Sequence, residues 1–207
     1  MKTENSVLRQ QALESLNGNW GIAVGGFFIY LVITGVYQSV PFIGSVASLI
    51  LTGPFQLGLI KFTLAISRQD EPRIEQLFEG FNDFNRALQA YLRTLLFVIL
   101  WALLLIVPGI IAALSYSMTF FILADDVNIS ANEAMQKSKV MMEGHKMDLF
   151  LLSLSFIGWA ILCVLTLGIG FLWLIPYMQV SIAKFYQDRK GTDEPFSSNS
   201  SLLDDYI

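Results

Sequence analysis

The sequence predicts an all-α membrane protein with six transmembrane helices, arranged as three parallel helical-hairpin repeats with short cytoplasmic amphipathic helices between them. Three observations support this prediction: the composition, the length of the charge-free stretches and the placement of Lys and Arg. Of the 207 residues, 54% are hydrophobic and only 14% are charged. Soluble domains contain about 25% charged residues, so the composition argues against a soluble enzyme, a disordered chain and a disulfide scaffold.

Three stretches contain no Asp, Glu, Lys or Arg, namely residues 15–60, 94–124 and 149–183. As straight helices they would be about 69, 46 and 52 Å long, whereas a hydrocarbon core needs only roughly 20 helical residues. Each stretch has Pro or Gly near its middle, and these are the strongest chain breakers. The predicted turns are at Pro41 and Gly44, at Pro108 and Gly109, and at Gly168 and Gly170. The hairpins are therefore expected over about 20–66, 87–125 and 147–187.

The basic residues determine how many spans are expected. With six spans, all 13 Lys and Arg lie on one side of the membrane, and the three opposite turns are uncharged. With five spans, Lys137, Lys139 and Lys146 would move to the outside. The positive-inside rule therefore favours six spans with both termini in the cytoplasm.

Two domain-level expectations follow from the composition. Residues 1–190 are expected to form one six-span domain, in which acidic and basic residues balance. Residues 191–207 are rich in Ser and acids, so they are expected to form a disordered acidic cytoplasmic tail. The net charge of −4 comes from this tail, and a neutral body gives no support to nucleic-acid binding.

The chain also resembles three copies of one unit. Gly18, Gly80 and Gly144 each end a polar, partly amphipathic stretch that precedes a predicted hairpin, and they are spaced 62 and 64 residues apart. The second spans of the first and third units share a Pro, a Gln and a Lys in the same order. Before the third unit, Ser130 and Glu133 form a capping-box pattern that predicts a helix start.

The sequence offers no candidate catalytic residue, metal site or cofactor site. The one His, His145, and the one Cys, Cys163, lack the partners and spacing of a metal or nucleophile site. Polar residues within the predicted spans remain, foremost Gln56, Gln179, Ser115 and Tyr116. They are expected either to bond between helices, as such residues usually do, or to line a polar cavity between hairpins.

A group of short motifs indicates a family. They are GPFQLGLIKF at 53–62, ILADD at 122–126, SANEA at 130–134, MEGHK at 142–146, LSFIGW at 154–159, TLGIG at 166–170 and LWLIPY at 172–177. Together, over about residues 8–188, the chain resembles the bacterial integral membrane family catalogued as domain of unknown function 975. That resemblance implies a multi-pass protein of the bacterial cytoplasmic (inner) membrane, and it brings no activity and no catalytic residue with it. A looser likeness exists to the membrane domain of glycerophosphodiester phosphodiesterases, but this chain has no room for their catalytic domain.

The expected function is non-catalytic. We expect a scaffold, accessory or envelope-homeostasis protein that binds lipid between its hairpins. Two alternatives stay open: a small permease or channel with a polar cavity, and an immunity or self-protection protein. The expected partners are membrane lipids and, at the cytoplasmic face, a protein, while the sequence leaves the oligomeric state open.

Overall fold

The computed structural model describes residues 3–39 and 43–197, and within these ranges all regular structure is helical. The predicted turn residue Pro41 and residues 198–207 of the predicted tail lie outside the described residues. The elements in chain order are α1 (Asn5–Leu16), α2 (Trp20–Gln38), α3 (Ile43–Arg68), the 3-10 helix η1 (Ile74–Phe81), α4 (Phe84–Leu104), α5 (Ile106–Tyr116), α6 (Thr119–Asp125), α7 (Ala131–Met141), α8 (Lys146–Leu154), α9 (Ile157–Leu165) and α10 (Phe171–Ser197).

Helices occupy all six segments predicted as spans, but not all of these helices are long and apolar enough to cross a membrane. Among the described residues, four stretches are long and apolar enough: Val46–Arg68, Phe84–Leu104, Ile106–Asp125 and Lys146–Leu165. A fifth results if α1 and α2, which meet at 96°, count as one broken span. α10 is not among these stretches, because polar residues such as Lys184 and Asp188 interrupt its apolar half. The structure therefore defines a helical protein with four or five candidate spans, and the six-span topology stays a prediction.

The reversal of the middle hairpin is not where the sequence predicts it. Leu105 is extended between α4 and α5, three residues before the predicted turn at Pro108 and Gly109. Pro108 instead lies in the first turn of α5, where its missing N–H leaves no hydrogen bond unmade. A Cβ on Gly109 would lie 2.8 Å from the Cα of Ala102, so this glycine allows α4 and α5 to pack closely.

The other predicted turn residues fall in different settings. Gly44 is helical and lies in the first turn of α3, just after the part of the chain that is not described. Gly168 and Gly170 lie between α9 and α10, and Gly168 has a φ of +88° that side chains rarely adopt. At the C-terminus, α10 continues to Ser197, so residues 191–197 of the predicted disordered tail are helical.

Two predicted spans are interrupted near their middles, between α5 and α6 and between α8 and α9. At each interruption a serine hydroxyl donates to a carbonyl three residues earlier, from Ser117 to Leu114 at 2.8 Å and from Ser155 to Leu152 at 2.6 Å. Such bonds compete with the helical ladder and bend the helix. These serines therefore contribute to the bends, although similar bonds from Thr34, Thr63 and Ser181 occur within continuous helices.

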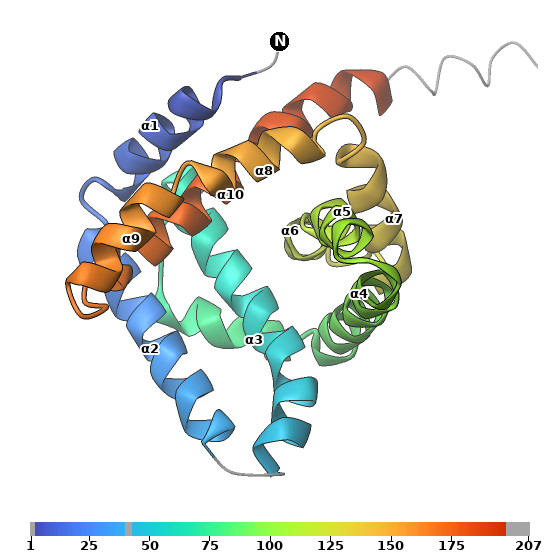
Figure 1. Cartoon of the computed structure of the whole chain (residues 1–207), viewed down its shortest axis with the longest axis horizontal. Coiled ribbons are helices and arrows are strands. Elements are labelled where there is room, and N and C mark those ends of the chain that lie inside the picture. The colour runs from blue at the N-terminus through green and yellow to red at the C-terminus, as the bar shows by residue number, and fades with distance from the viewer. Residues whose placement is uncertain (1–2, 40–42, 198–207) are drawn as a thin grey trace, which may run out of the picture.

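The long helices cross one another instead of forming an upright bundle of three parallel hairpins. In Figure 1, α4 and α5 are seen nearly end on, whereas α2 and α3 lie across the view. Small residues on α3 explain the close crossing. A Cβ on Gly53 would lie 2.6 Å from the carbonyl oxygen of Ala87 on α4, and one on Gly58 would lie 2.0 Å from that of Leu77 on η1. Glycine at a crossing lets two backbones approach closely.

The three glycines of the predicted repeat divide into two kinds. Gly18 and Gly144 have φ values of +84° and +78° and lie at corresponding junctions, between α1 and α2 and between α7 and α8. Gly80 lies within η1, where a Cβ would meet the Pro54 carbonyl oxygen at 1.9 Å. The first and third units thus share a left-handed junction, whereas the second uses its glycine for close packing.

Large apolar side chains remain uncovered at the ends of the hairpins. The five consecutive residues from Leu103 to Val107 are each at least 65% exposed, and Leu167 is 95% exposed. Monomeric soluble proteins rarely expose contiguous apolar surface of this kind. Charged residues lie at the other ends of these helices and form linked ion pairs. We call this charged end the polar base; it contains Lys61, Arg68, Asp83, Arg86, Asp125 and Lys190.

Candidate functional site

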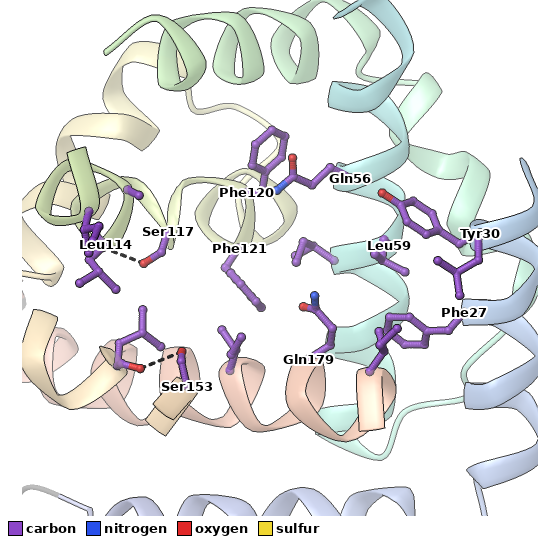
Figure 2. Close-up of a pocket in the computed structure, with 17 residues that line it drawn as sticks. Phe27, Tyr30, Gln56, Leu59, Leu114, Ser117, Phe120, Phe121, Ser153 and Gln179 are labelled. Atoms are coloured by element: carbon purple, nitrogen blue, oxygen red, sulfur yellow. Dashed lines mark hydrogen bonds between the residues drawn. The ribbon is translucent and has the colours of Figure 1, made fainter. Parts of the chain in front are cut away.

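A cavity of about 630 Å³ lies among the crossing helices, with walls contributed by both ends of the chain. Its size is typical of small-molecule sites. Figure 2 shows α10 running across α3 beside it. The described lining residues are Phe27, Tyr30, Leu31, Gln56, Leu59, Ile60, Ile110, Ala113, Leu114, Ser117, Phe120, Phe121, Leu149, Ser153, Ile175, Gln179 and Ile182.

Gln56 and Gln179, the two glutamines singled out from the sequence, line this same cavity. Figure 2 shows them on α3 and α10, with their carboxamides directed into the space between the helices. Both side chains are half-buried, and neither amide forms a hydrogen bond with another described residue. Two amides with free donors and acceptors therefore face an otherwise apolar space, which is the arrangement expected of groups that orient a ligand.

The other polar groups of the lining are less available. Ser117 donates its hydroxyl proton to the Leu114 carbonyl, and Ser153 donates to the Leu149 carbonyl at 3.0 Å. These hydroxyls keep only their acceptor capacity toward the cavity. Tyr30 completes the polar part of the lining. None of the seventeen described lining residues carries a charge.

Ser115 and Tyr116, the other two predicted cavity residues, point elsewhere. Ser115 is buried, and its carbonyl accepts a hydrogen bond from the Ser138 hydroxyl at 2.8 Å. Ser138 in turn accepts a bond from the Met118 N–H, so this hydroxyl from α7 bridges the break between α5 and α6. Tyr116 packs on Phe97 of α4, with ring centroids 6.0 Å apart.

Helical periodicity explains why Ser115 and Tyr116, the residues of α5 selected from the sequence, do not line the cavity. Counted from Ile110, the lining residues Ala113, Leu114 and Ser117 lie at i+3, i+4 and i+7, as residues on one helix face do. Ser115 and Tyr116 fall between these positions. A count of helical spacing from Ile110 would therefore have selected Ser117.

We place the mouth of the cavity at those lining residues that are both apolar and exposed. Leu31 on α2 and Ile110 on α5 both line it, yet they are 41% and 45% exposed. Ala113, one turn along from Ile110, is exposed as well. The mouth is thus framed by apolar side chains, as expected of an entrance that faces hydrocarbon.

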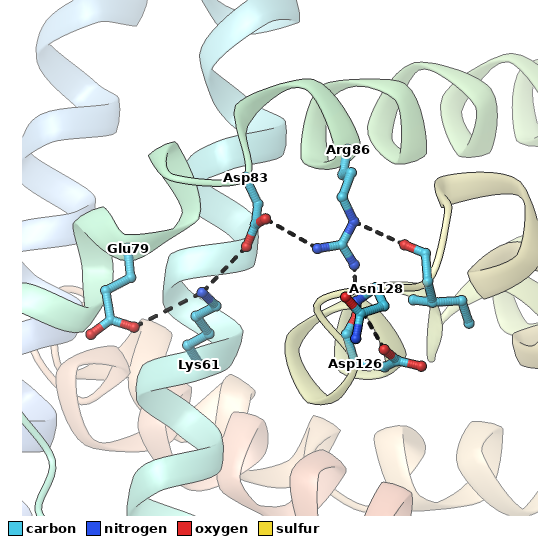
Figure 3. A network of polar contacts seen from close by, with 7 residues as sticks. Lys61, Glu79, Asp83, Arg86, Asp126 and Asn128 are labelled. Atoms are coloured by element: carbon cyan, nitrogen blue, oxygen red, sulfur yellow. Dashed lines mark hydrogen bonds and ion pairs between the residues drawn. The ribbon is translucent and has the colours of Figure 1, made fainter.

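The polar base consists of ion pairs that tie the ends of several helices together. Lys61 on α3 lies 3.6 Å from Asp83 and 3.9 Å from Glu79, and Asp83 also pairs with Arg86 at 3.1 Å (Figure 3). Arg86 reaches across to the loop after α6, where it donates to the Ile129 carbonyl. This network fixes η1 and the start of α4 against α3.

A second part of the base centres on Asp125 at the end of α6. Its carboxylate accepts from Arg68 at 2.6 Å, from Lys190 at 2.9 Å and from the Tyr186 hydroxyl at 2.9 Å. Nearby, His145 contacts Asp148 and Arg189. Every one of these groups serves another protein group, so the contacts are those of a structural clamp. The described residues include no group of three or more His, Cys, Asp or Glu placed to hold a metal ion.

The fold, the uncovered hairpin ends and the segregation of charge define a helical membrane protein. A family model described as "Protein of unknown function (DUF975)" matches residues 92–192, and this match supports the resemblance to that family. The matched region contains the motifs between residues 122 and 177, whereas the motif at 53–62 lies before it. No match supports the likeness to glycerophosphodiester phosphodiesterases. No curated protein and no solved structure matches the chain.

Proposed function

We propose that the protein is a non-catalytic integral protein of the bacterial cytoplasmic membrane that binds a lipid in the cavity between its helices. The observation that carries the proposal is the cavity itself, which combines an apolar lining with two unpaired amides and an apolar mouth. Apolar walls offer a favourable environment to an acyl chain. The amides offer hydrogen bonds to a polar group near the chain.

The proposal includes the six-span topology with both termini in the cytoplasm. The placement of Lys and Arg supports it, because the hairpin ends at Leu105 and at 166–170 are uncharged. Transmembrane helices tilt by about 20° on average and by up to about 40°. The crossing of α4 and α5 with α2 and α3 in Figure 1 therefore requires some of the six spans to be strongly tilted.

A substitution at the mouth tests lipid binding. In Ala113→Trp, an indole replaces a methyl group on an exposed lining residue, so it obstructs the mouth without overpacking the core. We expect the wild-type protein to retain a stoichiometric lipid through purification in mild detergent, and Ala113→Trp to lose it. Lipid is measured by extraction and mass spectrometry after size-exclusion chromatography.

Val164→Trp is the matched control, because Val164 is 64% exposed on α9 and does not line the cavity. It is expected to retain lipid like the wild type. Equal lipid retention in Ala113→Trp and Val164→Trp, or no retained lipid in the wild type, would contradict the proposal.

A small permease is the second candidate, and the unpaired amides of Gln56 and Gln179 are the observation that favours it. A permease for uncharged solutes would need such groups along its path. The test is swelling of reconstituted vesicles in isotonic glycerol or urea, followed by light scattering. Faster swelling with the wild type that disappears in the Gln56→Leu, Gln179→Leu double variant would favour the permease, whereas the lipid-binding proposal expects no faster swelling.

A further inference from the structure

We infer that the lipid bound in the cavity is an uncharged lipid alcohol, of which diacylglycerol is the simplest example. This inference rests on the proposed lipid-binding function and adds the chemical class of the ligand. It starts from the charge of the lining. The described lining contains two free carboxamides, two serine hydroxyls and one phenol, and no cation.

The nearest basic side chains on the two amide-bearing helices are already engaged. Lys61 and Lys184 each follow a cavity glutamine by five residues, which places them about 7.5 Å further along the helix. Lys61 pairs with Asp83 and Glu79, and its side chain is only 16% exposed. Lys184 donates to the Ser67 carbonyl at the polar base. Neither lysine can pair with an anion in the cavity without losing these contacts.

A phosphate group in the cavity would therefore lack a counter-charge. Removing an anion from water without a partner is very unfavourable. A hydroxyl is accepted much more readily, because it can donate to one carboxamide oxygen and accept from the other carboxamide N–H. The same carboxamides can also donate to ester carbonyls. The lining thus favours hydroxyl and ester groups over a phosphorylated head group.

The mouth supports the same class. Leu31 and Ile110 frame it with apolar side chains, and both are exposed at the surface. An uncharged lipid resides within the hydrocarbon, so it can enter sideways through such a mouth. A phospholipid would have to draw its charged head group past these side chains.

Two lipids with identical acyl chains test the inference. Dioleoylglycerol and dioleoylphosphatidic acid differ only in the phosphate, and each is titrated into the purified full-length protein in detergent. Binding is followed by the shift in thermal unfolding and by native mass spectrometry. We expect dioleoylglycerol to bind at least about tenfold more tightly than dioleoylphosphatidic acid.

The double variant Gln56→Leu, Gln179→Leu should weaken dioleoylglycerol binding by about tenfold, because it removes both hydrogen-bonding amides. Gln89→Leu is the control, since Gln89 is exposed on α4 outside the cavity. The comparison of the two lipids on the wild type is decisive even where the double variant does not fold.

Equal or tighter binding of dioleoylphosphatidic acid would overturn the inference and leave the lipid-binding function standing. Failure of both lipids to bind, in a protein that retains no lipid after purification, would overturn the proposed function together with the inference.

Discussion

Single residues decide how closely the helices approach, and glycine does so through the absence of a side chain. Gly53, Gly58 and Gly80 all lie at crossings where a Cβ would collide with a backbone carbonyl. A backbone atom cannot move aside as the end of a flexible side chain can. These positions are therefore fixed by packing, whereas Gly21 and Gly25 on α2 have open space around the site of a Cβ.

Substitution of Gly58 tests this distinction. Gly58→Ala places a methyl group 2.0 Å from the Leu77 carbonyl oxygen, so α3 and η1 must separate. We expect the free energy of unfolding to fall by about 2 kcal/mol or more, measured by circular dichroism during heating in detergent. Gly25→Ala is the matched control and should leave stability unchanged or slightly higher, because Ala is the better helix former. Equal effects of the two substitutions would refute the packing role.

Residue-scale prediction from sequence succeeded where chemistry is local. The capping box at Ser130 and Glu133 is confirmed, because the Ser130 hydroxyl accepts from the Glu133 N–H and the Glu133 carboxylate accepts from the Ser130 N–H. The pattern needs only four residues, so no distant contact can override it. Gln56 and Gln179, by contrast, could be selected from the sequence, but only the three-dimensional arrangement places them on one cavity.

At the scale of elements, α7 depends on this cap. Hydrogen bonds from the backbone and the hydroxyl of Ser130 lower the pKa of Glu133 below its ordinary value of 4.5. A carboxyl with a lowered pKa in the folded state stabilises the fold at pH values above 4.5 and loses that effect as the pH falls through the lowered pKa. The start of α7 is therefore expected to loosen in acid.

The variant Glu133→Gln separates this effect from that of other acids. Glutamine can replace glutamate in a capping box, so the helix start persists while its titration is removed. We expect the wild type to lose more stability than Glu133→Gln between about pH 6 and pH 3, by thermal unfolding in detergent. Ser130→Ala should cost about 1 kcal/mol at neutral pH. Identical pH profiles of wild type and Glu133→Gln would show that the carboxylate contributes nothing.

The limits of element prediction have physical causes. Charge-free length located the six helical segments, because a run of apolar residues is a property of the sequence alone. The turn of the middle hairpin was misplaced because Pro108 is compatible with a helix start as well as with a turn. The breaks at Ser117 and Ser155 depend on hydroxyl-to-carbonyl bonds, and a serine in a span can equally leave the helix intact.

At the scale of the whole molecule, the crossing of the hairpins was not predictable from hydropathy. Hydropathy indicates which residues avoid water, but the angle between helices depends on which small residues meet. The contacts of Gly53 with α4 and Gly58 with η1 are of this kind. Likewise, the common cavity requires helices from both ends of the chain to come together, which no local pattern encodes.

Cysteine labelling tests the topology of the whole molecule. In a Cys163→Ala background, Leu167→Cys places a thiol in the turn between α9 and α10, and Gln136→Cys places one on the exposed face of α7. With both termini in the cytoplasm, a membrane-impermeant maleimide should label position 167 in intact spheroplasts and position 136 only after lysis. Labelling of position 136 before lysis would reverse the proposed orientation.

The bridge made by Ser138 links two regions that the chain separates by a loop. Its hydroxyl holds the backbone on both sides of the break between α5 and α6, and the residues just beyond that break, Phe120 and Phe121, form part of the cavity wall. A shift of α7 is therefore expected to reach this wall both through these hydrogen bonds and through the buried side chains that α7 packs against α6. A molecule that binds the exposed face of α7 would in this way alter the shape of the cavity.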